Sequence, residues 1–568
     1  MDETKCHIAM YPWFALGHLT PYIHIANMLA KKGHMISFLV PRNTQYKLEP
    51  FNHHPNLISF VPIKVPHVEG LPLGAETTSD VPSSLHPLIM TAMDKTEKVV
   101  ESLLQDLTVD VVFFDLAHWI PNVCRRIRVK SVNYCTIPPV TVGYVFSPAR
   151  RINWSKGISE SDLMHPPVGF PWPSIKFHAH EARNFTARSN MKFGSDITLV
   201  ERAYIALIQS DALAYNASRE LEGPFIDYLQ TQFRKPVLLA GPMVIDPPNT
   251  TLTENLSTWL DGHNPGSVIY IAFGSECALT TAQFQELLLG LELTQMPFLA
   301  ALKPPVGTDS INDAIPNGLL ERLEGRGLVY GGWVQQNLIL QHGSVGCFVT
   351  HCGWGSLSEG LVSKCRLVLL PNGGDQIVNS RIMSEVYGVG IEVKKGEEDG
   401  VFTKMDVFEA IKKVMDEDGE VGKEVRDKHE KIREFLLNKD VKSAYIDTEL
   451  NMSNSIEALA MAGVDYNEWG MDFDEWERME MMAPPPPHLY ADEYEDEDED
   501  DDYKQDEYEF DEKHIHGDGD GDDDGIKYLK GGDHDRSELI GKVVAMIILI
   551  LREPLNLFIG FTYNPETF

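Results

Sequence analysis

Two titratable side chains, His18 and Asp115, each lie at the end of an apolar run of the sequence. Residues 6–16 and 109–114 have the composition of buried strands, and this places both side chains at the carboxyl edge of a doubly wound sheet, where such folds bind ligands. A carboxylate that closes a buried strand is costly unless it is solvated or paired, and a neighbouring imidazole is a suitable partner. Many loop histidines are merely structural, so the position alone leaves both interpretations open for His18.

A second group of chemically informative residues lies in residues 333–376. A glycine turn between a strand and a helix lets the backbone approach a phosphate, and the helix directs free N–H groups at it. Glu359, Asp375 and Gln376 supply partners for hydroxyl groups. The pattern predicts a phosphate-linked sugar at the carboxyl end of a sheet; the alternative is an ordinary βαβ unit. Strand, turn, helix and strand are expected at residues 346–350, 351–356, 357 onward and 367–370.

The 333–376 window resembles the signature segment of plant UDP-glycosyltransferases, the family with the GT-B fold. So many matching residues in one window make a specific signal, unlike a lone glycine motif. The resemblance implies two Rossmann-like domains that face a cleft and an enzyme that transfers a sugar from a UDP-sugar. The matching residues are Trp333, Gln336, His342, Gly346, His351, Cys352, Gly353, Trp354, Ser356, Glu359, Pro371, Asp375 and Gln376.

The resemblance gives His18 and Asp115 catalytic roles. An acceptor hydroxyl is a poor nucleophile at neutral pH, and His18 stands at the family's position for the base that activates it. Asp115 is expected to orient the ring and to stabilise the imidazolium. Direct displacement at the anomeric carbon inverts its configuration, so an α-linked UDP-sugar would give a β-linked product. The resemblance implies no metal, and the UDP-sugar is a co-substrate rather than a cofactor.

The resemblance also assigns the contacts of the UDP-sugar. The residues expected in this site come from the 333–376 window, apart from one that comes from an earlier glycine turn. They are Trp333 against the uracil, Gln336 and Glu359 at the ribose, Ser275, His351 and Ser356 at the diphosphate, Trp354, Asp375 and Gln376 at the sugar, and Val334, Gly353 and Gly355 beside them.

Segments outside the window resemble one plant branch, which extends the sugar of flavonoid glycosides, typically anthocyanidin or flavonol 3-O-glucosides. Gly355 stands where many family members have Asn, and glycine is frequent there in this branch. Trp354 stands where the branch commonly has Phe, which leaves the donor undecided. Gln376 favours UDP-glucose, whereas UDP-xylose, UDP-rhamnose and UDP-galactose stay open. The segments that carry the branch resemblance are 12–18, 70–80, 180–183, 220–224 and 284–293.

Two successive α/β domains are expected to position these residues. In the first, the helix after the first strand is expected to start at a Thr20 cap with Pro21 at its first position. Residues 165–175 are rich in proline and are expected to form a loop over a pocket. The expected boundaries are a first domain at 1–242, a linker at 243–256, a UDP-sugar domain at 257–446 and a possible return helix at 447–463.

Composition restricts the possible partners and the compartment. The formal net charge is −35, but residues 465–537 carry 29 acidic and 6 basic side chains and so account for −23 of it. The rest of the chain is mildly acidic and has no basic surplus for nucleic acid. Seven cysteines without a CxxC pair are typical of free thiols, and no signal peptide is visible, so a cytoplasmic enzyme is expected.

The end of the sequence departs from the family. Residues 464–537 form an acidic segment, with ten acidic residues among the eleven at 492–502, and such a segment is expected to be disordered. Residues 538–568 are more hydrophobic, but the nine apolar residues at 543–551 are too few for a bilayer, which needs about 20. A strand, an interfacial helix, an anchor, a fusion and a gene-model error all stay open for this segment, and membrane association is not expected.

The leading hypothesis is an inverting UDP-sugar-dependent O-glycosyltransferase that acts on a flavonoid or anthocyanidin 3-O-glycoside. A related alternative is transfer to another small hydrophobic acceptor, such as a terpenoid glycoside. An alternative of a different class is a non-catalytic scaffold with a GT-B body and an acidic interaction tail. Intact His18, Asp115 and window residues favour an enzyme.

Overall fold

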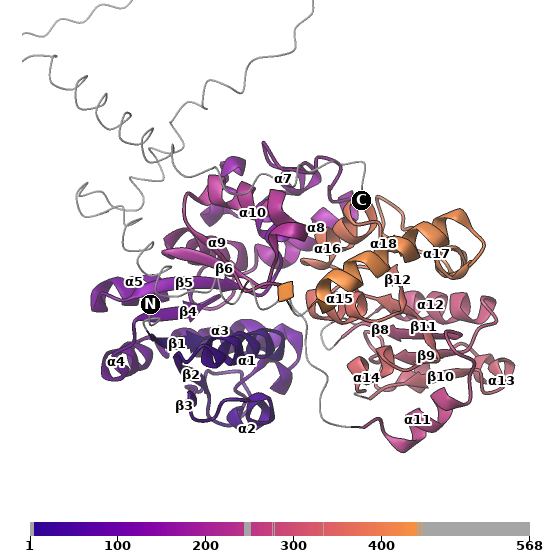
Figure 1. Ribbon diagram of the computed structural model, residues 1–568, viewed down its shortest axis with the longest axis horizontal. Helices are drawn as coiled ribbons and strands as arrows, with labels where there is room; N and C mark the ends of the chain where they lie inside the picture. The colour runs from indigo at the N-terminus through magenta and orange to yellow at the C-terminus, as the bar shows by residue number, and fades with distance from the viewer. Residues whose placement is uncertain are drawn as a thin grey trace, which may run out of the picture. The chain divides into compact units, whose positions relative to one another are not determined.

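The computed structural model describes residues 5–242, 251–274, 277, 279–332, 334–438, 440, 441 and 445. These residues form α/β structure with two parallel sheets (Figure 1), as the sequence predicts. The first sheet has the order β3-β2-β1-β4-β5-β6-β7, and the second has the order β10-β9-β8-β11-β12-β13. We call residues 5–242 the first-sheet region and residues 251–438 the second-sheet region.

The strands are short, and those inside each sheet are buried, whereas the edge strands β3, β10 and β13 are partly exposed. Those of the first sheet are β1 (His7–Tyr11), β2 (Met35–Pro41), β3 (Ile58–Ile63), β4 (Val111–Phe114), β5 (Lys130–Cys135), β6 (Ala212–Tyr215) and β7 (Val237–Leu239). Those of the second sheet are β8 (Val268–Ala272), β9 (Phe298–Ala301), β10 (Gly327–Tyr330), β11 (Val345–Thr350), β12 (Arg366–Leu369) and β13 (Gly390–Glu392).

Helices connect the strands of both sheets. The first-sheet region contains α1 (Leu16–Lys31), α2 (Gln45–Leu48), α3 (His86–Asp94), α4 (Glu97–Leu107), α5 (Ile120–Ile127), α6 (Pro139–Val145), α7 (Glu160–Met164), α8 (Ala179–Ser189), α9 (Leu199–Gln209) and α10 (Arg219–Phe233). The second-sheet region contains α11 (Glu254–Asp261), α12 (Thr281–Leu293), α13 (Leu319–Leu323), α14 (Gln336–Leu340), α15 (Trp354–Val362), α16 (Gln376–Arg381), α17 (Lys404–Met415) and α18 (Glu420–Leu437).

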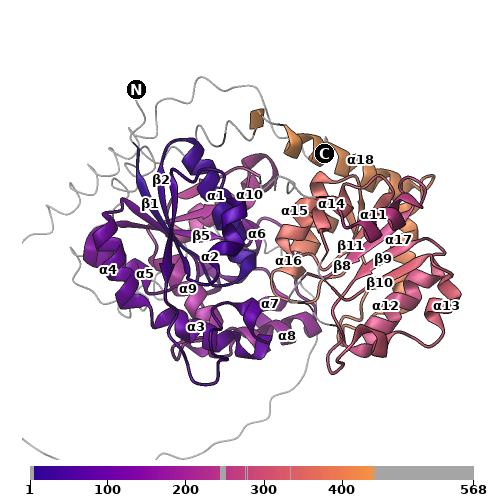
Figure 2. The ribbon, with the colours of Figure 1, turned by 90° about the horizontal axis from the view of Figure 1, so that it is seen from below.

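Both faces of each sheet are covered by helices (Figures 1 and 2). In β1, Ile8 and Met10 pack with α1, whereas Ala9 and Tyr11 point to the opposite face, where α3, α4 and α5 supply the apolar side chains. Successive residues of a strand point to opposite faces, so a strand that is covered on both sides must be apolar at every position. This explains why the strands of this chain are continuous apolar runs rather than alternating patterns.

The order of strands places the catalytic candidates next to each other. In the first sheet the order reverses between β1 and β4, and Ile8 pairs with Val111 there. In the second sheet it reverses between β8 and β11, where Val345 pairs with Val268. Ligands of open α/β sheets bind outside the carboxyl ends of the strands at such a reversal point. The loops after β1, β4, β8 and β11 are therefore the expected site.

Three expectations about local structure were wrong. Helix α1 begins at Leu16 instead of at Pro21, so His18 lies in its first turn rather than in a loop. Pro21 lies inside α1; it removes one N–H, and packing of eight buried residues of this helix outweighs that loss. Helix α11 begins at Glu254, inside the expected linker, because Leu256 and Leu260 are buried in the core.

Other expectations concern one loop and the end of the chain. The proline-rich residues 165–175 contain turns but no helix or strand, as expected, and none of them lines the cavity next to His18 and Asp115. No helix in the described parts of the chain has the length and apolar character needed to cross a membrane. The expected return helix at 447–463, the acidic segment and the hydrophobic residues 538–568 lie outside the described residues.

Candidate active site

His18 and Asp115 meet at the reversal point of the first sheet. His18 Nδ1 lies 2.7 Å from Asp115 Oδ2, and the side chain of Asp115 is only 5% exposed. Thr136 Oγ1, after β5, lies 3.2 Å from the same ring nitrogen. Because Nδ1 faces the carboxylate, Nε2 is the nitrogen that can exchange a proton with a ligand.

The backbone holds the Asp115 carboxylate in place. Its Oδ1 accepts hydrogen bonds from the N–H of Trp13, 2.8 Å away, and from the N–H of Leu116. The side-chain amide of Asn133 donates to the Asp115 carbonyl at 2.8 Å. These bonds come from the loop after β1, the turn after β4 and strand β5. A buried carboxylate needs such partners, so the turn after β4 is fixed on three sides.

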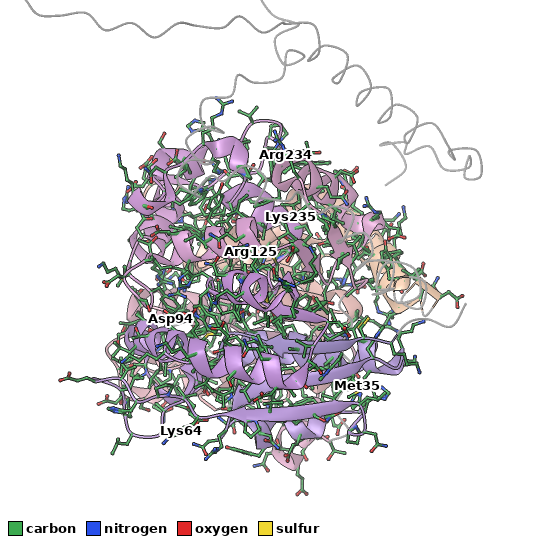
Figure 3. All side chains as sticks on the ribbon, turned by 90° about the vertical axis from the view of Figure 1, so that its left-hand side faces the viewer. Met35, Lys64, Asp94, Arg125, Arg234 and Lys235 are labelled. Carbon is green, nitrogen blue, oxygen red and sulfur yellow. The ribbon has the colours of Figure 1, made fainter. Side chains whose placement is uncertain are left out.

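A buried ion pair supports the same turn from behind. Arg202 of α9 is fully buried and binds Asp94 with Nη1 at 2.9 Å and Nη2 at 2.6 Å. Its Nη1 also lies 3.3 Å from the carbonyl oxygen of Leu116 and 2.8 Å from His118 Nδ1. Asp94 ends α3 and is labelled in Figure 3. Arg202 therefore links α3 and α9 to the turn that carries Asp115.

The histidine and the aspartate open into a largely apolar cavity of about 250 Å³, which we call the His18 cavity. Helices α6, α8 and α9 supply most of its apolar wall. Two residues of the second-sheet region, Gly374 and Asp375, complete the lining. The cavity thus brings the proposed base and one expected sugar ligand into the same space. The remaining lining residues are Leu116, Asn133, Cys135, Thr136, Ile137, Thr141, Val142, Val145, Phe146, Phe185, Ser189, Leu199, Val200, Ala203 and Leu207.

His351 lies between two glycines at the reversal point of the second sheet. A Cβ added at Gly274 would lie 3.1 Å from the ring, and one added at Gly353 would lie 2.6 Å from its Nε2. Gly274 has φ +66°, a conformation that suits glycine. Burial lowers the pKa of His351 to about 4, so the ring is neutral at neutral pH. Neither glycine can be replaced without a shift of this imidazole.

Helix α15 presents its N-terminus at the same place. It begins at Trp354 with Gly353 as its N-cap, and no side chain caps it. Consequently the first N–H groups of the helix have no partner within it, which favours an anion. A Cβ added at exposed Gly355 would meet nothing within 4 Å, so the first turn is open. Cys352, which precedes the N-cap, has φ +67°.

Gln336, Ser356 and Glu359 form one hydrogen-bonded group. Gln336 Nε2 donates to Glu359 Oε2 at 2.6 Å and to Ser356 Oγ at 3.1 Å. Tyr270 of β8 lies 3.4 Å from Gln336 Oε1. Burial raises the pKa of Glu359, although the bond from Gln336 opposes this. The structure therefore unites two expected ribose ligands and one expected diphosphate ligand.

The loop after β12 carries Asp375 and Gln376. The oxygen of the Gln376 side chain accepts from the N–H groups of Asn372 at 3.0 Å and Gly373 at 3.2 Å, so it shapes the loop. Asp375 accepts from the amide of Asn379 at 2.9 Å and lines the His18 cavity. Asp375 is thus directed toward the cavity by a residue one helical turn further on.

The remaining expected site residues fall into two groups. Trp354 and Val334 are half-buried and pack against a hydrophobic cluster that contains residues of both regions. Ser275 and Trp333 lie outside the described residues, so their expected contacts with diphosphate and uracil stay predictions. The absence of a metal requirement also stays a prediction.

Sequence reasoning missed Thr136 and Asn379, which contact His18 and Asp375, and also Thr141, which lines the His18 cavity, and Arg202, which supports the turn after β4. The spacing between Asp375 and Asn379 was a usable signal, because residues four apart on a helix are neighbours. The other three residues reach the site only through the fold. Arg202, for example, lies 87 positions after Asp115 in the sequence.

Comparisons with known proteins agree with this geometry. A family model described as UDP-glucoronosyl and UDP-glucosyl transferase matches residues 313–425. A cyanidin 3-O-galactoside 2''-O-xylosyltransferase of Actinidia chinensis var. chinensis is 60% identical over 447 residues, which cover 79% of this chain and 98% of the relative. An anthocyanidin 3-O-glucoside 2''-O-glucosyltransferase of Ipomoea purpurea is 59% identical, with 79% and 97% covered.

Solved structures show the same fold. A UDP-glucosyltransferase of Polygonum tinctorium superposes with a TM-score of 0.64 at 23% identity, and the match covers 79% of this chain and 99% of that protein. A Glycyrrhiza uralensis UDP-glycosyltransferase gives a TM-score of 0.65 at 19% identity, with 82% and 99% covered. The expected two-sheet GT-B fold is thereby confirmed.

Proposed function

The chain belongs to the plant UDP-glycosyltransferases, and on that premise we propose that it adds a sugar to the 2''-hydroxyl of an anthocyanidin or flavonoid 3-O-glycoside. Both relatives named above are described as 2''-O-glycosyltransferases of anthocyanidin 3-O-glycosides. The acceptor would therefore be a flat hydrophobic ring system that carries one sugar, and the attacking group would be a hydroxyl of that sugar.

The observation that carries the proposal is the shared lining of the His18 cavity. His18 and Asp115 come from the first-sheet region, whereas Gly374 and Asp375 come from the loop that is expected to hold the donor sugar. The cavity wall is otherwise mostly apolar, which suits a flavonoid ring, and Thr136, Thr141 and Ser189 supply hydroxyl groups for an acceptor sugar.

The reaction proceeds as a single displacement. The acceptor oxygen attacks the anomeric carbon of the UDP-sugar while its proton passes to His18 Nε2. The bond between the anomeric carbon and the diphosphate oxygen breaks, and UDP leaves with the electron pair. Asp115 stabilises the imidazolium that forms. The free N–H groups of α15 and the neutral His351 ring face the charge that develops on the diphosphate.

The donor sugar is open between two candidates. One relative is described as a xylosyltransferase and the other as a glucosyltransferase, at nearly equal identity. Gln376 favours UDP-glucose, so we propose UDP-glucose first and UDP-xylose second. UDP-rhamnose and UDP-galactose are included in the test.

The experiment is a product screen with the purified full-length chain. The four UDP-sugars are combined with cyanidin, quercetin and their 3-O-glucosides and 3-O-galactosides, and products are identified by mass spectrometry and NMR. We expect one added sugar at the 2''-position of the glycosides and none on the aglycones. His18→Ala should lower kcat by about 10²–10⁴-fold, the usual contribution of a general base, with UDP affinity unchanged. The matched control is His53→Ala, because His53 is exposed and does not line the His18 cavity.

Two outcomes would contradict the proposal. No product with any flavonoid glycoside, together with a product in a second screen on terpenoid glycosides, would keep the enzyme and change its substrate. Tight UDP binding without turnover for any acceptor would favour the non-catalytic scaffold instead.

A further inference from the structure

Asn379, on the second turn of α16, is fully buried at the boundary between the two regions. Its Nδ2 donates to Asp375 Oδ2 at 2.9 Å and to the carbonyl oxygen of Cys352 at 3.1 Å. Its Oδ1 accepts from Thr141 Oγ1 at 3.2 Å. One side chain therefore contacts three places. They are the loop between β12 and α16 that carries Asp375, which we call the sugar loop, the turn before α15, and a residue that lines the His18 cavity.

The orientation of this amide is fixed by its partners. Asp375 Oδ2 and the carbonyl of Cys352 can only accept, so both require the NH₂ group of Asn379. The rotated amide would place its oxygen against both of these acceptors. Thr141 then faces the amide oxygen and donates its hydroxyl proton. A buried polar group with every partner in place fixes its neighbours, and the loss of one partner is costly.

Each contact reaches a different part of the site. Asp375 is the expected sugar ligand that lines the cavity. Cys352 has a positive φ and precedes the N-cap of α15, where the diphosphate is expected. Thr141 is on α6, in the wall of the His18 cavity. Asn379 thus forms hydrogen bonds with all three of these residues.

We propose that Asn379 is a positioning residue that holds the Asp375 carboxylate toward the donor sugar and links this position, through Thr141, to the wall of the acceptor cavity. The inference rests on the proposed function for the identity of the donor and acceptor sites. Asn379 does not itself touch the reacting atoms. It acts through Asp375. Because Thr141 and Asp375 both form a hydrogen bond with Asn379, the wall of the His18 cavity and the sugar loop keep one position relative to each other.

The first test measures donor binding, which does not depend on the acceptor. Calorimetry with the full-length chain gives the Kd values of UDP and of UDP-glucose for the wild type and for Asn379→Ala. We expect the ratio of the UDP-glucose Kd to the UDP Kd to rise about tenfold, the size of a lost hydrogen bond to a charged group. The UDP Kd should change by less than about threefold, which also shows that the variant is folded.

The second test asks whether the effect passes through Asp375. In an Asp375→Asn background, Asn379→Ala should cost little more, because the carboxylate that it positions is already gone. If the losses in UDP-glucose affinity caused by Asp375→Asn and by Asn379→Ala multiplied in the double variant, the proposal would be overturned. Ser380→Ala is the matched control. Ser380 is equally buried on the same helix and donates to Glu392 at 2.7 Å, so its loss should leave the Kd ratio unchanged.

The third test uses pH. Asn379→Asp keeps the shape of the side chain but places two carboxyl groups in contact, and these can share a proton only at lower pH. The ratio of variant to wild-type kcat/KM should therefore rise as pH falls from about 8 to about 6. A ratio that does not change with pH would contradict the role of Asn379 as a donor to Asp375.

These readouts separate the two proposals. If the wild type transfers no sugar to any glycoside, the proposed function fails, yet the Kd ratio still tests Asn379. If transfer occurs and the Kd ratio is unchanged in Asn379→Ala, the positioning role fails alone.

Thr141→Val should raise the acceptor KM, whereas Thr141→Ser, which keeps the hydroxyl, should leave it near the wild-type value.

Discussion

Single side chains at this site work because the residues around them leave little freedom. Asp115 is held by two backbone N–H groups, so it can present only one oxygen to His18. His351 is held closely between two glycines. The first arrangement keeps a charge in a buried position, and the second keeps a ring neutral by excluding water.

His351 gives a prediction about pH. Its pKa is lowered to about 4 by burial, below the ordinary value of 6.5. Between these values the unfolded chain binds the proton and the folded chain does not, so this residue makes the folded state less stable as pH falls from about 6.5 to about 4. His351→Gln lacks this contribution. As pH falls through this range, the unfolding free energy of the wild type should therefore decrease relative to that of the variant by up to about 1.4 kcal/mol per pH unit.

Urea unfolding of both proteins at several pH values checks the prediction for His351. Other buried histidines, such as His118 and His429, are common to both proteins and cancel in the difference. A constant difference across this range would show that His351 binds its proton equally well in the folded and the unfolded chain, and would contradict the prediction.

At the scale of the element, the turn between β4 and α5 depends on one helix that precedes it in the sequence and on one that follows it. Arg202 of α9 and Asp94 of α3 form a buried pair behind Leu116. Strand β4 has four residues and ends at Phe114, so its own hydrogen bonds cannot fix the turn that follows it. The position of Asp115 is therefore a property of the packed helices α3, α5 and α9.

We predict that Arg202→Met lowers the free energy of unfolding by about 3–5 kcal/mol, because it leaves the Asp94 carboxylate buried without its partner. Denaturant titration measures this. The double variant Asp94→Leu with Arg202→Met should recover part of the loss, since a buried pair can often be replaced by apolar residues. Arg126→Ala, which breaks an exposed pair with Glu101, is the control and should have no measurable effect. Equal losses in Arg126→Ala and Arg202→Met would contradict the prediction.

At the scale of the whole molecule, buried charges join the two regions. Glu181 of α8 accepts from Arg381 Nη2 at 3.1 and 3.0 Å, and Lys395 Nζ lies 3.7 Å away. Burial by itself would raise the pKa of Glu181, but Arg381 and Lys395 hold it below its usual value. Lys395 also donates to the carbonyl of Pro371, at the start of the sugar loop, at 2.8 Å. The carboxylate of Glu181, in the first-sheet region, is therefore connected through Lys395 to the loop that carries Asp375.

We predict that Glu181→Gln loosens both regions together. Arg381 and Lys395 would each lose a carboxylate partner, so amide hydrogen exchange should become about tenfold faster in α8 and in α16, which belong to different regions. Mass spectrometry of the exchanged peptides measures this. Glu160→Gln, which removes an exposed partner of Arg183, is the control and should leave both peptides unchanged. Faster exchange in α8 alone would mean that the two regions are not coupled through this pair.

The sequence by itself determined the α/β class, most strands of both sheets and the 333–376 window. These depend on local composition: a strand covered on both faces must be apolar throughout, and a glycine turn before a helix is visible in a few residues. Strands β11 (Val345–Thr350) and β12 (Arg366–Leu369) lie within one residue of their expected ranges for this reason. Strands β3, β7 and β13 were not predicted: β3 and β13 are partly exposed and lack a continuous apolar pattern, and β7 has only three residues.

The tertiary structure alone decided which residues meet. The pairing of β1 with β4 brings His18 within hydrogen-bond distance of Asp115 across 97 positions, and no local pattern encodes that order of strands. The contact between Thr141 and Asn379 spans 238 positions and joins two regions whose helices are individually unremarkable. Local sequence sets which elements form, whereas the placement of the site follows from how their apolar faces pack against one another, and this is a property of the whole chain.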